Sequence, residues 1–362
     1  MLKKLSAVLV LSLGVLHSAQ ACTGGQIKAT DNSVVFGRTL EFAKNLNSDV
    51  IVIPRQFFLH ASSPTNQPAM TWKSKYAAVG TNAENTPIIV DGLNEKGLAV
   101  GSFYFPGMAG YQEVSGDEVS KSLSSIDLGI WLLTNFATID EVKEGLKQIK
   151  VSKAQFTPWN MTLPLHYIVT ESSGKSIVIE YIKGEMHLYD NPIGVLTNTP
   201  GFDWHLMNLN NYINLSKKGV NGFDMGSLHL ESTGAGSGML GLPGDFTPPS
   251  RFVRIAFFTA NAKPVDNAKG AVEALFHLLN NFDLPNGSVE EVTNGQPSYD
   301  VTQWTSVNDL ANKRFYFKSR NNQNIQMLDL NQLDLDAKEI KKVTMGGETQ
   351  VENLSDKAVA VQ

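Results

Sequence analysis

The amino-acid sequence predicts an α+β fold in which helices cover sheets within a single domain. Segments with the apolar patterns of β-strands recur along most of the chain. Segments with helical periodicity, mostly in pairs, separate these strand clusters. The 362 residues contain no internal repeat and no linker rich enough to divide them, so the strands and helices are expected to share one core.

Strand patterns dominate the first hundred residues. Turn signals such as Asp31-Asn32 and the polar stretch 94–97 separate them. The strands expected here lie at residues 26–29, 34–38, 50–53, 71–79, 87–91 and 98–105.

Helices and strands alternate in the rest of the chain. Asp140 and Glu141 fall in the first turn of one expected helix, where negative charge is favourable. The helices expected here lie at 125–136, 139–149, 204–215, 251–260 and 268–281. The strands expected here lie at 166–170, 176–182, 186–189, 314–318 and 325–328, and 342–344 could add an edge strand.

The composition excludes several classes of protein. With 42% apolar and 18% charged residues, the chain is globular rather than disordered. A net charge of −5 argues against a basic nucleic-acid surface. The single Cys can form neither an internal disulfide nor a Cys-rich zinc site. The glycine-rich stretch 236–241 has the spacing G-x-G-x-x-G but follows no strand, so we predict no dinucleotide site. The sequence has no H-E-x-x-H and its histidines are scattered singly, so we predict no metal, and we expect no other cofactor.

Residues 1–21 have the pattern of a secretory signal peptide. Lys3 and Lys4 precede an apolar run at 5–16, and Ala19-Gln20-Ala21 is a small-x-small cleavage site. The run is shorter than the roughly 20 residues that span a bilayer. We therefore expect a soluble periplasmic or secreted protein without a membrane span, whose first residue is Cys22.

A Cys at a signal junction has three interpretations. It can be an N-terminal nucleophile, the lipid-attachment residue of an anchored protein, or an inert thiol. Lipoprotein signals carry an aliphatic residue three positions before the Cys and a small one two positions before it, where this chain has Ala19 and Gln20.

A terminal Cys suits nucleophilic catalysis because its own α-amino group can act as the base. The amine titrates near ~7.7–8.0 and the thiol near ~8.5. A hairpin centred on Asp31-Asn32 would place Cys22 near Glu41 and put Arg38 ~10 Å along the partner strand, within reach of the thiolate. Arg251 opens a helix after a Gly/Pro loop, where its charge opposes the helix dipole.

Several segments, in order, resemble the choloylglycine hydrolases, which comprise bile salt hydrolases and penicillin V acylases, within the N-terminal-nucleophile hydrolases. The matching segments are Cys22-Thr23-Gly24, Phe36-Gly37-Arg38-Thr39-Leu40-Glu41, Asn94-Glu95-Lys96-Gly97-Leu98 with Phe105-Pro106-Gly107, Leu196-Thr197-Asn198-Thr199-Pro200, and Gly241-Leu242-Pro243-Gly244-Asp245 leading into Pro249-Ser250-Arg251-Phe252-Val253-Arg254.

The resemblance implies a four-layer αββα sandwich that forms one domain at 22–362 and is often tetrameric. It implies that Cys22 is the nucleophile, that Arg38 and Arg251 support the thiolate, and that Asn198 donates to the oxyanion. Glu41 stands where many members have an Asp that orients the terminal amine. In this departure the chain resembles the exported subgroup of the family.

The expected activity is hydrolysis of linear amides. Tyr104 stands where penicillin V acylases also have Tyr and bile salt hydrolases have Asn, and Phe42 and Phe103 are expected beside it in an acyl pocket. This favours penicillin V or N-acyl homoserine lactones as the small-molecule substrate. The alternatives are a conjugated bile salt hydrolase and a lipid-anchored protein of the same fold without activity.

We expect the intact mass of the exported protein to equal that of residues 22–362 with an unmodified Cys22, because lipidation would acylate the amine that serves as base. Mass spectrometry of the intact protein provides the measurement. A diacylglyceryl adduct on Cys22 would support the anchored alternative instead.

Overall fold

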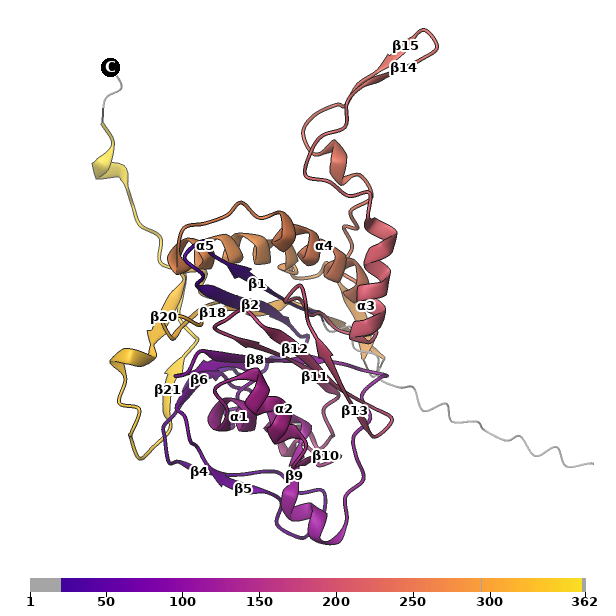
Figure 1. Ribbon diagram of the computed structural model, residues 1–362. Coiled ribbons are helices and arrows are strands. Elements are labelled where there is room, and N and C mark those ends of the chain that lie inside the picture. The colour runs from indigo at the N-terminus through magenta and orange to yellow at the C-terminus, as the bar shows by residue number, and fades with distance from the viewer. Residues whose placement is uncertain (1–20, 294, 360–362) are drawn as a thin grey trace, which may run out of the picture.

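Two antiparallel sheets lie face to face at the centre of the computed structural model, which describes residues 21–293 and 295–359 (Figure 1). The first sheet has the strand order β1-β2-β18-β19-β20 and the second β13-β12-β11-β8-β7-β6-β3-β21. The strands of the first sheet are β1 (Cys22–Lys28), β2 (Val34–Glu41), β18 (Thr302–Asp309), β19 (Arg314–Ser319) and β20 (Gln326–Asp329). Those of the second are β3 (Asp49–Ile53), β6 (Ala78–Thr81), β7 (Asp91–Asn94), β8 (Leu98–Tyr104), β11 (Leu165–Glu171), β12 (Ser176–Ile182), β13 (Glu185–Asp190) and β21 (Lys341–Thr344).

A pair of helices covers the outer face of each sheet (Figure 1). Helices α4 (Pro248–Asn261) and α5 (Ala268–Leu279) pack on β1, β2 and β18. Helices α1 (Ser125–Asn135) and α2 (Ile139–Leu146) pack on the second sheet, mainly on β7, β8 and β11. The predicted α+β class and the four-layer αββα sandwich are confirmed.

Smaller elements complete the chain. The expected helix at 204–215 is shorter in the structure, where α3 spans Phe202–Asn208 and a 3-10 turn at Leu209–Tyr212 follows it. Four two-stranded pairs are also present: β4 (Phe58–His60) with β5 (Thr71–Lys73), β9 (Ser122–Ser124) with β10 (Lys150–Ser152), β14 (Phe223–Met225) with β15 (Leu228–Leu230), and β16 (Glu290–Thr293) with β17 (Gln296–Tyr299).

Two predicted strands differ from the structure. The stretch 71–79 is divided, because the amides of Lys75 and Tyr76 donate to the carbonyl of Thr134 instead of a neighbouring strand. Strand β7 begins only at Asp91, so residues 87–90 lead into it rather than forming it. The expected helices at 125–136, 139–149, 251–260 and 268–281 are present, and the edge strand at 342–344 pairs with β3.

The hairpin of β1 and β2 has a register one residue away from the predicted one. Ala29 donates its amide to the carbonyl of Ser33, and Asn32 has a positive φ of 70°. These are the marks of a three-residue loop, whose centre is Asp31 alone. Cys22 therefore pairs with Leu40 rather than with Glu41. Because side chains alternate between faces, this register places Arg38 on the same face as Cys22, and Glu41 on the other.

A long arm between α3 and α4 carries the β14–β15 hairpin away from the body (Figure 1). Its apolar side chains Phe223, Met225 and Leu228 are exposed.

No described helix is long and apolar enough to cross a membrane. Residues 1–20 of the expected signal peptide lie outside the described residues, and the single-domain and oligomer expectations stay predictions.

Candidate active site

Cys22 begins β1, the edge strand of the first sheet, and its side chain is only 4% exposed. On its free edge, β1 meets the segment that contains Asn198. The amide of Gly24 donates to the carbonyl of Leu196 at 2.8 Å, and the amide of Leu196 returns a bond of 3.1 Å. This pairing brings Asn198 beside Cys22 although 176 residues separate them.

The side chain of Asn198 contacts three of its neighbours. Its Oδ1 accepts from the backbone N of Cys22 at 2.8 Å and from Nη2 of Arg251 at 2.7 Å. Its Nδ2 donates to the carbonyl of Tyr104 at 2.8 Å. An amide NH₂ has two hydrogens, so one is used here and one is left for a substrate. The predicted role in binding an oxyanion stays a prediction that this geometry permits.

Arg251 lies in the first turn of α4 and turns inward, where it is 1% exposed. Its Nη1 donates to the carbonyl of Cys22 and to the hydroxyl of Thr23, and its Nε donates to the carbonyl of Phe246 at 2.8 Å. Burial lowers the pKa of Arg251 to about 10. This value is still above neutral pH, so the guanidinium stays charged there. These acceptors offset the unfavourable position of the cation at a helix N-terminus.

Arg38 lies on the thiol face of the hairpin and is fully buried. Its Nη1 donates to the carbonyl of Ser102, and its guanidinium lies 4.0 Å from the ring centre of Phe103. Burial raises the pKa of the Cys22 thiol, and the positive charge of Arg38 is the strongest influence that lowers it. Arg38 therefore favours the thiolate, which is the reactive form of a cysteine.

Glu41 occupies the opposite face of β2. Its Oε1 accepts from the hydroxyl of Thr302 at 3.0 Å. Burial raises the pKa of Glu41 to about 8, although Arg251 and Arg38 act in the other direction. In the uncleaved chain the nitrogen of Cys22 is a peptide nitrogen and donates to Asn198. The expected contact of Glu41 with a terminal amine stays a prediction.

A narrow cavity of about 60 Å³ opens beside the Cys22 thiol. Apart from Arg38 and Ser102, its walls are apolar or aromatic, and they include Phe42, Tyr104 and Trp159. The ring of Phe42 lies 5.3 Å from that of Trp159 and meets Tyr104 edge-on at 6.1 Å. A larger cleft of about 420 Å³ beside Trp304 has no cysteine in its walls.

Phe103 does not line this cavity. Its ring lies beneath the guanidinium of Arg38 and is fully buried. Neighbouring residues of a strand point to opposite faces, and Tyr104 takes the cavity side, so the expected substrate contact of Phe103 stays a prediction. Trp159, in contrast, does line the cavity.

The structure adds two polar residues that sequence reasoning missed. Thr23 accepts from Arg251, and the buried carboxyl of Asp91 is a counter-charge that interacts with Arg38. Asp91 is fixed by Ser306 and Asn308 across the two sheets. Thr23 lies in the first matching segment, although that segment gives it no role, and no sequence signal marks Asp91, because its role depends on pairing between distant strands. Within the described ranges, no cluster of His, Cys, Asp and Glu could hold a metal ion.

The pKa of Glu41 predicts how pH affects stability. An unfolded Glu titrates near ~4.3, whereas Glu41 keeps its proton in the folded protein up to a pH of about 8. Between pH 5 and 8 the folded state therefore holds a proton that the unfolded chain has already released, and the free energy of unfolding of wild type falls as pH rises. Glu41→Gln lacks this titration. We expect its free energy of unfolding, relative to wild type, to increase by roughly 2–4 kcal/mol between pH 5 and 8.

Urea unfolding at pH 5, 6.5 and 8 measures this difference. The exposed Glu144→Gln provides the control and should show no such trend. A Glu41→Gln difference that stays flat or shrinks toward pH 8 would contradict the assignment of a raised pKa.

Comparison with known proteins shows which family this chain belongs to. The family model described as linear amide C–N hydrolases, choloylglycine hydrolase family, matches residues 22–343. The bile salt hydrolase/transferase of Clostridium perfringens is 35% identical over 322 residues, which cover 88% of this chain and 95% of that protein. The penicillin V acylase of Pectobacterium atrosepticum is 27% identical, over 83% of this chain and 78% of that protein. The crystal structure of a conjugated bile acid hydrolase variant from Clostridium perfringens matches with a TM-score of 0.82 and 33% identity, over 92% of this chain and all of that one. This chain therefore belongs to the choloylglycine hydrolase family of linear amide C–N hydrolases.

Proposed function

We propose that this chain is a cysteine amidohydrolase that uses Cys22, freed as the N-terminal residue, as its nucleophile. The observation that carries the proposal is the position of Cys22. Its side chain lines an apolar cavity while Arg251 and Asn198 bind its backbone. A thiol at the wall of a cavity, beside a buried cation, is the arrangement that nucleophilic catalysis requires.

Export supplies the base in this proposal. Cleavage between Ala21 and Cys22 by a signal peptidase would turn the Cys22 nitrogen into an amine in the periplasm or outside the cell. The family match also begins at residue 22, which supports this boundary. An amine at the same place could still donate one hydrogen to Asn198 Oδ1 and keep its lone pair for the thiol proton.

The reaction then follows from the positions of these groups. The amine takes the thiol proton, and the thiolate forms a bond to the amide carbonyl carbon. Asn198 donates its second Nδ2 hydrogen to the oxyanion. The ammonium returns the proton to the leaving nitrogen as the C–N bond breaks, which leaves a thioester. Water, deprotonated by the same amine, hydrolyses the thioester and restores the thiol.

A compact apolar acyl group fits the cavity best. The walls near Cys22 are Phe42, Tyr104 and Trp159, and the space is small. We therefore propose penicillin V or an N-acyl homoserine lactone as the substrate. Conjugated bile salts are the second candidate, because the relative named bile salt hydrolase/transferase is 35% identical and the one named penicillin V acylase 27%. The homo-oligomer also remains a proposal.

We expect wild-type protein to hydrolyse penicillin V or an acyl homoserine lactone with a higher kcat/KM than glyco- or tauro-conjugated bile salts. Cys22→Ser should lower kcat to the background level for every substrate, because a hydroxyl ionises far less readily than a thiol. Parallel hydrolysis assays provide the measurement, and an unchanged Tm shows that the variant is folded. Retained activity in folded Cys22→Ser would refute the mechanism, and preferred cleavage of bile salts would overturn the substrate assignment.

A further inference from the structure

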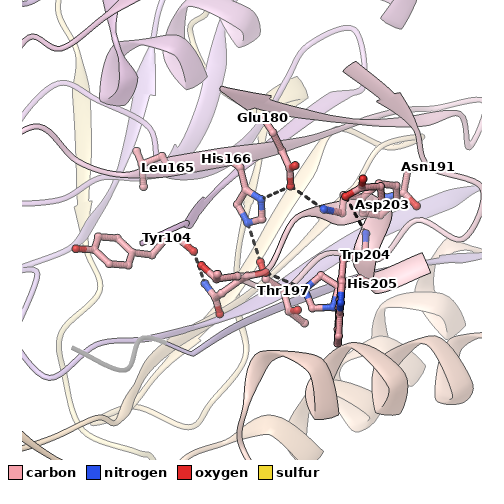
Figure 2. A network of polar contacts seen from close by, with 12 residues as sticks. Tyr104, Leu165, His166, Glu180, Asn191, Thr197, Asp203, Trp204 and His205 are labelled. Atoms are coloured by element: carbon pink, nitrogen blue, oxygen red, sulfur yellow. Dashed lines mark hydrogen bonds and ion pairs between the residues drawn. The ribbon is translucent and has the colours of Figure 1, made fainter. Parts of the chain in front are cut away.

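A second buried polar network contacts the backbone carbonyls of Thr197 and Asn198. It contains His166 from β11, Glu180 from β12 and His205 from α3. All three side chains are fully buried. Figure 2 shows His166 between the carboxylate of Glu180 and the backbone of Thr197, with His205 below.

The hydrogen-bond partners fix where each imidazole carries a proton. The Nε2 of His166 lies 2.9 Å from the carbonyl oxygen of Thr197, and the Nε2 of His205 lies 2.9 Å from that of Asn198. A carbonyl oxygen can only accept, so both Nε2 atoms must bear hydrogen and donate. The two histidines thus donate to two consecutive carbonyls.

Consecutive carbonyls belong to the peptide planes on the two sides of one residue, which here is Asn198. Fixing both planes fixes φ and ψ of Asn198, since these are its only soft backbone torsions. Its side chain must reach Cys22, Arg251 and the carbonyl of Tyr104 at once. A small rotation of either plane would move the amide away from all three.

Glu180 ties the two imidazoles into one unit. Its Oε1 lies 3.0 Å from Nδ1 of His166 and accepts the amide of Phe202, the first residue of α3, at 3.0 Å. Helix α3 in turn carries His205. The imidazole of His166 stacks on Phe105 at 4.2 Å, and that of His205 stacks on Phe252 at 4.5 Å.

Packing alone does not explain a histidine at position 205. Burial lowers the pKa of His205 to about 4, so the ring is neutral. Its Nδ1 is buried without a hydrogen-bond partner among the residues that the structure describes. An unpaired buried nitrogen is costly, and a phenyl ring would stack on Phe252 without that cost. What His205 adds over Phe is the Nε2–H donor.

We propose that His166, Glu180 and His205 are positioning residues that fix both peptide planes of Asn198, and that amide hydrolysis depends on their two Nε2–H donors. The inference deepens the proposed function and rests on it.

His205→Phe and His205→Gln separate positioning from packing. His205→Phe keeps a stacked ring but loses the donor, whereas Gln can present an N–H near the place of Nε2. We expect His205→Phe to lower kcat by about 10-fold to 100-fold with KM changed less than about 2-fold, since a misplaced oxyanion donor acts in the transition state. His205→Gln should recover most of kcat.

Trp72→Phe provides the matched control. It removes another buried donor, which bonds the hydroxyl of Thr134 at 2.9 Å away from the site. It should lower Tm and leave kcat unchanged. If His205→Phe and His205→Gln only lower Tm, as the control does, the positioning role is overturned.

Two readouts keep this inference distinct from the proposed reaction. Alkylation of Cys22 by iodoacetamide forms no oxyanion, so its rate should stay within about 2-fold of wild type in His205→Phe. The side-chain amide ¹⁵N–¹H resonances of Asn198 should shift in His205→Phe and not in Trp72→Phe. Asn198 resonances that do not shift in His205→Phe would refute the inference, whatever the activity of the wild type. Wild-type protein that hydrolyses no amide would refute only the proposed function.

Discussion

The guanidinium of Arg251 is the interaction on which the rest of the site depends. From α4 it binds β1 through the carbonyl of Cys22 and the hydroxyl of Thr23, the 196–200 segment through Asn198, and the loop before α4 through the carbonyl of Phe246. The charge is fully buried, so losing one acceptor would leave one of its N–H donors unpaired, at a cost of roughly 1–3 kcal/mol or more. Arg251 therefore links the positions of these segments around Cys22.

The register of the β1–β2 hairpin divides the charges of the site between two faces. Arg38 shares the face of the thiol and stabilises its ionised form, whereas Arg251 and Glu41 lie on the other face, where Arg251 binds the backbone of β1. A shift by one residue would exchange these faces. The three-residue loop around Asp31 sets that register, so a surface turn determines the electrostatics of a buried thiol.

Much of this arrangement could be predicted from the sequence, and the failures have physical causes. The helices α4 and α5 have clear apolar periodicity, and the terminal Cys22 with the ordered motifs brought Asn198 and Arg251 into the predicted site. Strand β18 was missed because its inward residues Ser306 and Asn308 are polar and bind Asp91 between the sheets. Such pairing depends on strands far apart in sequence, and periodicity within one segment cannot show it.

The central claim is that Arg38, across the hairpin from Cys22, favours the thiolate. The pH dependence of Cys22 alkylation by iodoacetamide tests it most directly, in wild type, in Arg38→Met and in the control Arg254→Met, whose guanidinium binds the carbonyls of Pro243 and Asp245. Loss of Arg38 should move the midpoint upward by about one pH unit or more, since a nearby opposite charge stabilises the ionised form by that much. The control should leave the midpoint in place. An Arg38→Met profile that coincides with wild type would contradict the account.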